Sequence, residues 1–231
     1  MAFNGFNNEI ARLVTLQRIE LATPLLIKIR KLFGRYLFTN FFSKFLISKH
    51  KVDELYYNRM LEEYNSLKRN IEFKNLNILS IGSGICGLEI LINNFHDGNQ
   101  FTIIEKNYVS KKIKYGSDYK NFEAYNDLIL LRDFLRNNQA NYNFRVYDFD
   151  LGNFPETKFD LVISLYSIDY HYDFDIYKTY LKKISSYQTQ LVFDTIRPDY
   201  FKTLFNKVEV ISETKKRIHS SKRIICSEFK V

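Results

Sequence analysis

The chain has 231 residues, of which 45% are hydrophobic and 26% are charged, and its net charge is +8. This composition is typical of a folded globular protein and excludes a disordered or fibrous chain, while the length fits one large domain with a helical extension. The positive charge is compatible with an anionic partner or with solubility alone, so it selects no function.

Two cysteines, Cys86 and Cys226, are too few for a disulfide scaffold, and neither has a second cysteine or a histidine at metal-ligand spacing. We therefore expect no metal site. No apolar run approaches the ~18 residues of a membrane span, and the first residues lack the pattern of a signal peptide. These features favour a cytoplasmic protein without a transmembrane segment.

Residues 1–72 are predicted to form an N-terminal helical cap or lid with three or four helices. Apolar residues recur at helical spacing over 10–19, and Thr23 precedes a proline as an N-cap residue precedes the first helical position. Gly34 stands where a helix C-terminal cap would, and Asp53 is expected to cap the last helix of the segment.

Basic and aromatic residues are concentrated between 24 and 49, where six Lys and Arg side chains accompany leucines and five phenylalanines. We expect their apolar face to pack on the rest of the chain or on a second subunit, which would give a homodimer through the N-terminal helices. A lid over the acceptor pocket, a membrane-surface helix and a nucleic-acid contact are the alternatives. A second basic run, 215–223, is interpreted as the solvated tip of a hairpin.

Residues 73–231 show the pattern of an α/β domain, in which short apolar runs alternate with helical stretches and form a mainly parallel sheet. The expected strands are 77–81, 101–105, 143–147, 161–165, 190–194, 208–212 and 223–229, and the expected helices are 87–94, 122–138 and 176–185. Only ten residues join the last two strands, which is too short for a helical crossover. Those two strands should therefore be antiparallel neighbours.

A glycine-rich loop follows the first strand, and its sequence from Gly82 to Gly87 is GSGICG. Glycines allow a tight turn and a close approach of the backbone to a ligand, and the helix that follows offers free N–H groups. Glu105 ends the second strand, where a carboxylate can accept both hydroxyls of a ribose. The pattern predicts a nucleotide-like ligand, against the alternative of a turn that merely needs glycines. Cys86 is interpreted as a small buried side chain.

The chain resembles the class I S-adenosylmethionine-dependent methyltransferases in the order of four segments. These are the ILSIGSGICG loop, Glu105, the YDFD stretch that begins at Tyr147 and the strand FDLVIS that begins at Phe159. The resemblance covers about residues 75 to 231. It implies an α/β, Rossmann-like, seven-stranded, mostly parallel sheet with an antiparallel last strand, and S-adenosyl-L-methionine as the cofactor. One departure is Ser80, because many members of the family have an acidic residue at that position.

The resemblance also implies which residues bind the cofactor. Gly82 and Gly84 would pass under its methionine part, Glu105 would hold the ribose, Asp148 would contact the adenine amino group and Phe149 would lie against the adenine ring. The remaining cofactor-binding residues that we predict are Ser83 and Ser164. The alternative for Asp148 is a solvated turn, and for Glu105 a surface carboxylate paired with a lysine.

The segment after the fourth expected strand, 165–175, has one histidine, three tyrosines and three aspartates. Ligands of open α/β sheets bind beyond the carboxyl ends of the strands, and methyl transfer requires an oriented acceptor and, for a hydroxyl, a base. We predict that His171 is the catalytic base or orienting group and that Tyr170 and Asp169 assist it. The alternative is that the aromatic residues pack under the next helix and that Asp175 caps it.

Further along the chain, Arg197 follows the fifth expected strand and could bind an acidic acceptor. The leading hypothesis is methyl transfer to an oxygen or nitrogen of a polar, sugar-like small molecule. The Tyr-His-Tyr stretch resembles bacterial sugar O-methyltransferases. The His-Tyr and Phe-Asp pairs within 171–175 also resemble messenger-RNA cap guanine methyltransferases, so RNA remains an alternative that we do not favour. A NAD-dependent oxidoreductase shares the glycine loop, but the long helical segment and the terminal antiparallel pair argue against it.

Overall fold

The computed structural model describes residues 2–107, 126–140, 142–169, 172–213 and 221–230. Its first part is helical and consists of α1 (Asn8–Gln17), the 3₁₀ turn η1 (Ile19–Leu21), α2 (Pro24–Leu37), the π-helical turn η2 (Phe38–Phe42), α3 (Ser43–Leu46) and α4 (Lys49–Leu67). Four α-helices therefore precede the first strand, as the sequence predicts.

Local sequence signals explain the start and the interruption of α2 but not the start of α4. The Thr23 hydroxyl accepts the Leu26 N–H at 3.3 Å and caps α2, and Gly34 has a φ of 78° that interrupts this helix. The prediction for Asp53 is wrong, because α4 begins four residues earlier at Lys49. The Asp53 carboxylate instead accepts the Phe3 N–H at 3.4 Å. It ties the first residues of the chain to α4 rather than capping that helix.

A seven-stranded sheet follows, with the order β3-β2-β1-β4-β5-β7-β6. The strands are β1 (Asn77–Ile81), β2 (Gln100–Glu105), β3 (Phe144–Asp148), β4 (Phe159–Ser164), β5 (Ser185–Thr195), β6 (Phe205–Glu213) and β7 (Lys222–Phe229). Strands β1 to β5 pair in parallel, whereas β7 is antiparallel to both β5 and β6. The predicted fold class and the predicted antiparallel pair are both confirmed.

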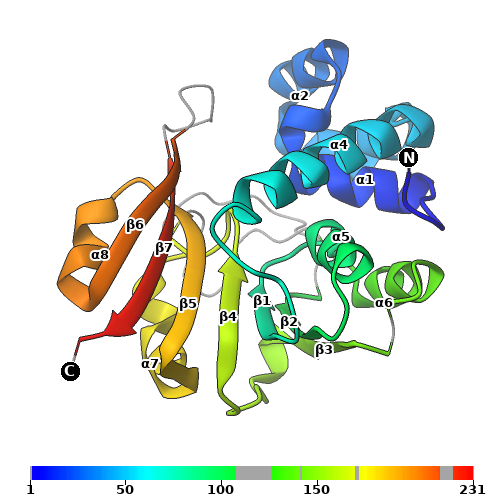
Figure 1. Ribbon diagram of the computed structural model, residues 1–231. Coiled ribbons are helices and arrows are strands. Elements are labelled where there is room, and N and C mark those ends of the chain that lie inside the picture. Colours follow the sequence, from blue (N-terminus) through cyan, green and yellow to red (C-terminus); the bar gives the residue numbers. More distant parts are fainter. Residues whose placement is uncertain (1, 108–125, 141, 170–171, 214–220, 231) are drawn as a thin grey trace.

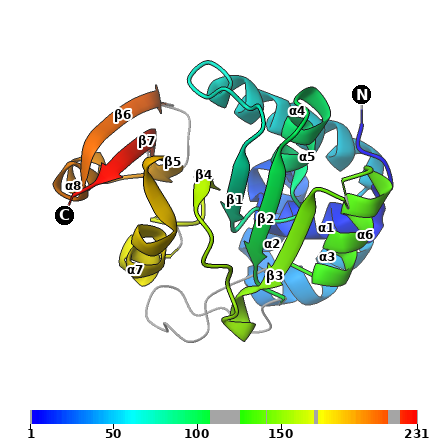
Figure 2. The same cartoon turned by 60° about the horizontal axis from the view of Figure 1, so that its bottom comes forward.

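Helices cover both faces of the sheet (Figures 1 and 2). They are α5 (Gly87–Phe95), α6 (Leu128–Asn137), α7 (Phe174–Ile184) and α8 (Pro198–Leu204). Neighbouring residues of β1 enter different core clusters, since Ile78 belongs to the one that includes α5 and α6 while Leu79 belongs to the one that includes α7 and α8. This alternation is the side-chain period of a strand that is buried on both faces.

The N-terminal helices share their core with the first face of the sheet. Phe3 and Met60 lie in the same cluster of buried side chains as Ile90 and Phe134. Figure 1 shows α1 and α4 beside α5, with α2 projecting beyond them. A domain division at residue 72 stays a prediction, and this core runs across it. Within the described residues, no helix combines the length and apolarity needed to cross a bilayer.

Candidate functional site

The loop between β1 and α5 has the backbone that its glycines predict. Gly82 and Gly84 have φ values of +69° and +65°, in the left-handed region that favours glycine. A Cβ atom at Gly82 would overlap the Ser167 hydroxyl, and one at Gly84 would lie 2.5 Å from the Gln17 Oε1 atom. The loop therefore runs tightly between the segment after β4 and the end of α1.

Glu105 ends β2 and lies against this loop. Its Oε2 atom accepts the Gly84 N–H at 2.7 Å, and its Oε1 atom accepts the Lys106 N–H at 3.0 Å. Burial raises the pKa of the carboxyl to about 7, and these two N–H groups and Asn126 oppose the shift. Each carboxylate oxygen can accept a second hydrogen bond. With the Asn126 side chain as a third donor, Glu105 is placed to receive one further donor, such as a ribose hydroxyl.

Asp148 is the neighbour of Glu105 across β2 and β3, since the two residues pair in register. Its carboxylate accepts the Asp150 N–H at 3.0 Å and so caps the 3₁₀ turn η3 (Phe149–Leu151). The Phe149 ring packs against Tyr177 at a centroid distance of 5.8 Å. The two residues predicted to contact adenine are thus half-buried and lie at the same edge of the sheet as Glu105.

A small cavity of about 20 Å³ lies at this edge, and its lining includes Gly82, Glu105, Phe149, Ser167, Tyr172 and Tyr177. A larger hollow of about 380 Å³ lies beside the end of α4, lined in part by Tyr64, Phe73 and His96. That hollow is at the opposite edge, because Phe73 precedes β1 and His96 follows α5. Ligands of open α/β sheets bind at the carboxyl ends of the strands, so we assign the site to the smaller cavity.

The two predicted serines make local contacts in the structure. Ser164 is buried, and its hydroxyl donates to the Ile81 carbonyl at 2.8 Å and accepts the Ile168 N–H at 3.1 Å. It fixes the segment after β4 to the end of β1. Ser83 lies within the glycine loop, where its hydroxyl is 3.2 Å from the Cys86 sulfur. Cys86 is fully buried, as expected. Cofactor binding by the two serines stays a prediction.

Asp169 links the segments that follow β4 and β5. The Thr195 hydroxyl and the Arg197 guanidinium both donate to its carboxylate, the latter through Nε at 2.9 Å. Arg197 also donates to Asp173 at 3.0 Å. Arg197, which was predicted as a possible ligand of an acidic acceptor, is thus bonded to two aspartates of its own chain. Asp169 has a φ of +62°, which these contacts hold in place.

Two of the three predicted catalytic residues, Tyr170 and His171, lie outside the described residues, so their roles stay predictions. On either side of them the described backbone is joined, because the Asp169 N–H donates to the Tyr172 carbonyl at 2.6 Å. Tyr172 lines the small cavity. The expectation that Asp175 caps the next helix is wrong by two residues. The cap is Asp173, whose carboxylate accepts the Asp175 N–H, and α7 begins at Phe174.

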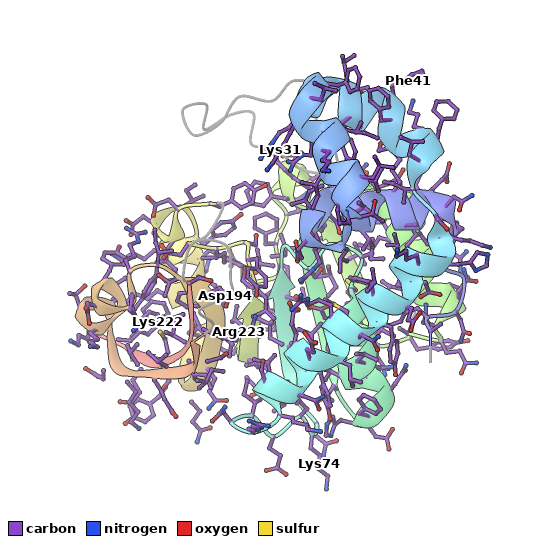
Figure 3. All side chains as sticks on the ribbon, turned by 90° about the horizontal axis from the view of Figure 1, so that it is seen from above. Lys31, Phe41, Lys74, Asp194, Lys222 and Arg223 are labelled. Carbon is purple, nitrogen blue, oxygen red and sulfur yellow. The ribbon has the colours of Figure 1, made fainter. Side chains whose placement is uncertain are left out.

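Two ion pairs, one of them fully buried, were not predicted from the sequence. Arg223 donates to both oxygens of Asp194 at 3.2 and 3.0 Å, and both side chains are fully buried (Figure 3). Arg18 of α1 donates to both oxygens of Glu63 of α4 at 2.8 and 3.1 Å. The ring of Tyr166 lies 5.5 Å from one guanidinium carbon and 5.7 Å from the other. These contacts join the N-terminal helices to β5 and β7.

The interpretation of 215–223 as a solvated tip is therefore wrong for Arg223, the last residue of that run. It stands directly before Ile224, Ile225 and Cys226, and an arginine at the start of such an apolar strand was the available signal. The signal does not identify the partner. Asp194 lies 29 residues away and meets Arg223 only because β5 and β7 pair in this register.

A further carboxylate, Glu89 of α5, contacts β1 just before the glycine loop. The Ser80 hydroxyl donates to Glu89 Oε1 at 2.5 Å, and Glu89 Oε2 has no hydrogen-bond partner among the described residues. Burial, with nearby Glu63 as a smaller cause, raises the pKa of Glu89 to about 7. Ser80 stands where the resembled family has an acidic residue. Here helix α5 supplies an acidic side chain at that place.

Comparisons with known proteins were made from the sequence and from the fold. No protein-family model and no curated protein sequence matches the chain. Among solved structures, N,N-8-amino-8-demethyl-D-riboflavin dimethyltransferase from Streptomyces davawensis is similar, with a TM-score of 0.56 and 9% identity over 95% of this chain and 70% of that chain. The pyocyanin biosynthetic protein PhzM gives a TM-score of 0.55 and 11% identity over 96% of this chain and 72% of that chain.

At these identities the likeness concerns the fold, and it agrees with the strand order and with the antiparallel position of β7. The chain has the fold of the class I S-adenosylmethionine-dependent methyltransferases. It spans about seven tenths of the length of both solved proteins.

Proposed function

We propose that the chain binds S-adenosyl-L-methionine at the carboxyl ends of β1, β2 and β3 and transfers its methyl group to an oxygen or nitrogen of a polar small molecule. The observation that carries this proposal is Glu105, whose carboxylate is bonded to Gly84 of the glycine loop and retains capacity for a hydroxyl donor. The strand order supports it over the NAD-dependent alternative, because the dinucleotide fold has the order 3-2-1-4-5-6 without an inserted antiparallel strand.

The polar groups present fit this cofactor. Glu105 would hold the ribose hydroxyls, Asp148 and Phe149 would contact the adenine, and the backbone of Gly82 and Gly84 would lie under the methionine part. A cavity of about 20 Å³ is too small for the whole molecule, so side chains around it must move when it binds. The cofactor supplies a methyl group on a positively charged sulfur, which is already activated for transfer.

The protein's own part in the reaction is to orient the acceptor, exclude water and accept a proton from a hydroxyl acceptor. We assign the acceptance of this proton to His171, which Tyr170 would assist. Asp169 serves as a positioning residue, because its carboxylate holds the segments after β4 and β5 together. Acidic side chains predominate there, namely Asp169, Asp173 and Asp175. They favour a neutral or cationic small molecule over the phosphates of RNA.

The binding half of the proposal is tested by calorimetric titration with S-adenosylmethionine, S-adenosylhomocysteine and NAD. Charged hydrogen bonds contribute about 1.5–3 kcal/mol each, so Glu105→Ala should weaken binding of the first two ligands about tenfold or more. Glu62→Ala, which removes an exposed carboxylate of α4, should change nothing. Tight binding of NAD with no response to S-adenosylhomocysteine would instead favour an oxidoreductase.

The catalytic half is tested with His171→Asn in single-turnover assays on candidate acceptors. Removal of a general base should lower the rate by roughly 10²–10⁴ and leave S-adenosylhomocysteine affinity unchanged. A merely structural histidine would instead alter the melting temperature and both affinities together. Full activity of the variant contradicts the assignment.

A further inference from the structure

Exposed apolar side chains are concentrated on one projecting part of the molecule, residues 24–46, which we call the α2–α3 hairpin. Seven large apolar side chains of this segment are exposed, including Leu32 at 78% and Phe45 at 72%. The others are Leu25, Phe33, Leu37, Phe41 and Leu46. Figure 1 shows α2 projecting past α1 and α4 on the side away from the sheet. Surfaces of this kind mark interaction sites in monomeric proteins.

The exposed rings pack on one another. Phe33 and Phe41 both contact Phe42, with centroid distances of 4.8 and 5.4 Å, and Phe41 contacts Phe45 at 5.3 Å. On the opposite side of the hairpin, Leu26 and Phe38 are buried in the core. The hairpin is therefore anchored by one face and presents a continuous aromatic face outward.

The charge of this region has one sign. Residues 24–51 contain seven Lys and Arg residues and no Asp or Glu. Lys28, Lys31 and Lys44 are exposed on the same segment as the apolar side chains, and Figure 3 shows Lys31 and Phe41 at two different edges of this part of the molecule. A complementary partner must therefore combine negative charge with an apolar interior.

We propose that the α2–α3 hairpin docks on an anionic lipid bilayer, with its phenylalanines and leucines among the acyl chains and its lysines at the headgroups. Such a surface offers both properties at once, and aromatic and leucine side chains flanked by lysines are the pattern of helices that lie in a membrane interface. A second copy of the hairpin would bring five cations against five, and an RNA would match the cations but leave Leu25 and Leu32 in water.

The test is sedimentation of the full chain with vesicles. Vesicles of phosphatidylcholine with one-third phosphatidylglycerol should bind the chain, and vesicles of phosphatidylcholine alone should bind it at least tenfold more weakly. The double variant Leu32→Ser/Phe45→Ser should lose at least tenfold in affinity for the anionic vesicles, because two largely exposed side chains no longer enter the bilayer. Lys28→Gln/Lys31→Gln should lose about fivefold for each cation removed.

Matched controls are Ile129→Ser on α6 and Lys178→Gln on α7, which change an equally exposed apolar side chain and an exposed cation elsewhere. They should bind like the unchanged protein. Binding that neither hairpin variant weakens overturns the proposal. A stable dimer in light scattering that Leu32→Ser/Phe45→Ser converts to monomer, without vesicle binding, assigns the face to a second copy. Lysine-dependent binding of RNA without vesicle binding assigns it to nucleic acid.

The variants lie outside the cofactor edge, so their melting temperatures and S-adenosylhomocysteine affinities should equal those of the unchanged protein. The docking proposal and the methyl-transfer proposal can therefore fail separately.

Discussion

The acidic side chains in the two halves of the sheet's carboxyl edge have different hydrogen-bond partners. At β1, β2 and α5, Glu105 and Glu89 are bonded to N–H and hydroxyl groups, and no cation of the described residues is bonded to either. Burial raises the pKa of each to about 7. At β4, β5 and β7, Asp169 and Asp194 are each bonded to an arginine.

This difference separates acidic groups with unfilled hydrogen-bonding capacity from acidic groups whose capacity an arginine fills. A buried carboxylate whose hydrogen-bonding capacity is incomplete gains free energy when donors arrive, whereas one that an arginine already satisfies has little left to gain. Ligand binding should therefore depend on the first half, and folding stability on the second.

The largest expected effect comes from breaking the fully buried pair. Arg223→Met leaves Asp194 charged, buried and without its cation, which should lower the free energy of unfolding by about 3–5 kcal/mol in urea denaturation. Asp194→Leu added to that variant should recover much of the loss. Arg136→Met, which breaks an exposed pair with Asp133, should cost less than about 1 kcal/mol. Equal losses of unfolding free energy in Arg223→Met and Arg136→Met would contradict the claim that the buried pair holds the fold.

The next effect concerns the pH dependence of stability at Glu89. Its pKa is about 7 in the folded chain against an ordinary 4.5, so between these pH values the folded state holds the proton more tightly than the unfolded state. Stability therefore falls as pH rises through this window, by up to about 3 kcal/mol for one group. Glu89→Gln should remove its share of that fall in melting curves recorded from pH 5 to 8. A fall that the variant leaves intact rules out Glu89 as its source.

A smaller effect should appear in cofactor affinity at Glu105. Ribose hydroxyls donate to the ionised carboxylate, and with a pKa of about 7 that form is scarce at pH 6 and dominant at pH 8. The affinity for S-adenosylhomocysteine should rise about tenfold between these pH values, and Glu105→Gln should bind weakly at both. The measurement is calorimetric titration in both buffers. An equally steep rise in the variant would place the titrating group elsewhere.

The smallest effect tests the helix that follows the acceptor segment. Asp173→Ala removes the side chain that caps α7 and should cost about 1 kcal/mol in thermal unfolding. Asp175→Ala, at the position that sequence reasoning favoured, removes no cap and should cost less. The reverse order would contradict the observed start of α7.

Sequence rules were sufficient for features that depend on neighbours within a few residues. The strand 77–81 was predicted with its observed limits, because a short apolar run there ends at a glycine loop whose backbone requires φ values that other residues resist. The antiparallel pairing of β6 and β7 followed from the length of their connection. The position of the antiparallel strand within the sheet was, by contrast, implied by the resemblance to the methyltransferases.

The helix starts at Lys49 and Phe174 show where such rules fall short. The side chain of the N-cap residue Ser48 makes no cap hydrogen bond to α4, and Asp173 rather than Asp175 caps α7, so a nearby polar residue does not by itself fix where a helix begins. Local rules were also insufficient for the site. A glycine loop and Glu105 can be recognised along the chain, but the hydrogen bond from Ser80 to Glu89 depends on how α5 packs against β1.

By itself the sequence determined the order of the elements, the glycine loop and the carboxylate at the end of β2, because each depends on local backbone preference or on position along the chain. Only the tertiary structure decided that Arg223 meets Asp194 and reaches Ser66, 157 residues away, and that the phenylalanines of the α2–α3 hairpin face outward. Contacts between distant residues follow from packing as a whole. The spacing of apolar residues along a helix does not show which of two apolar faces the core will bury.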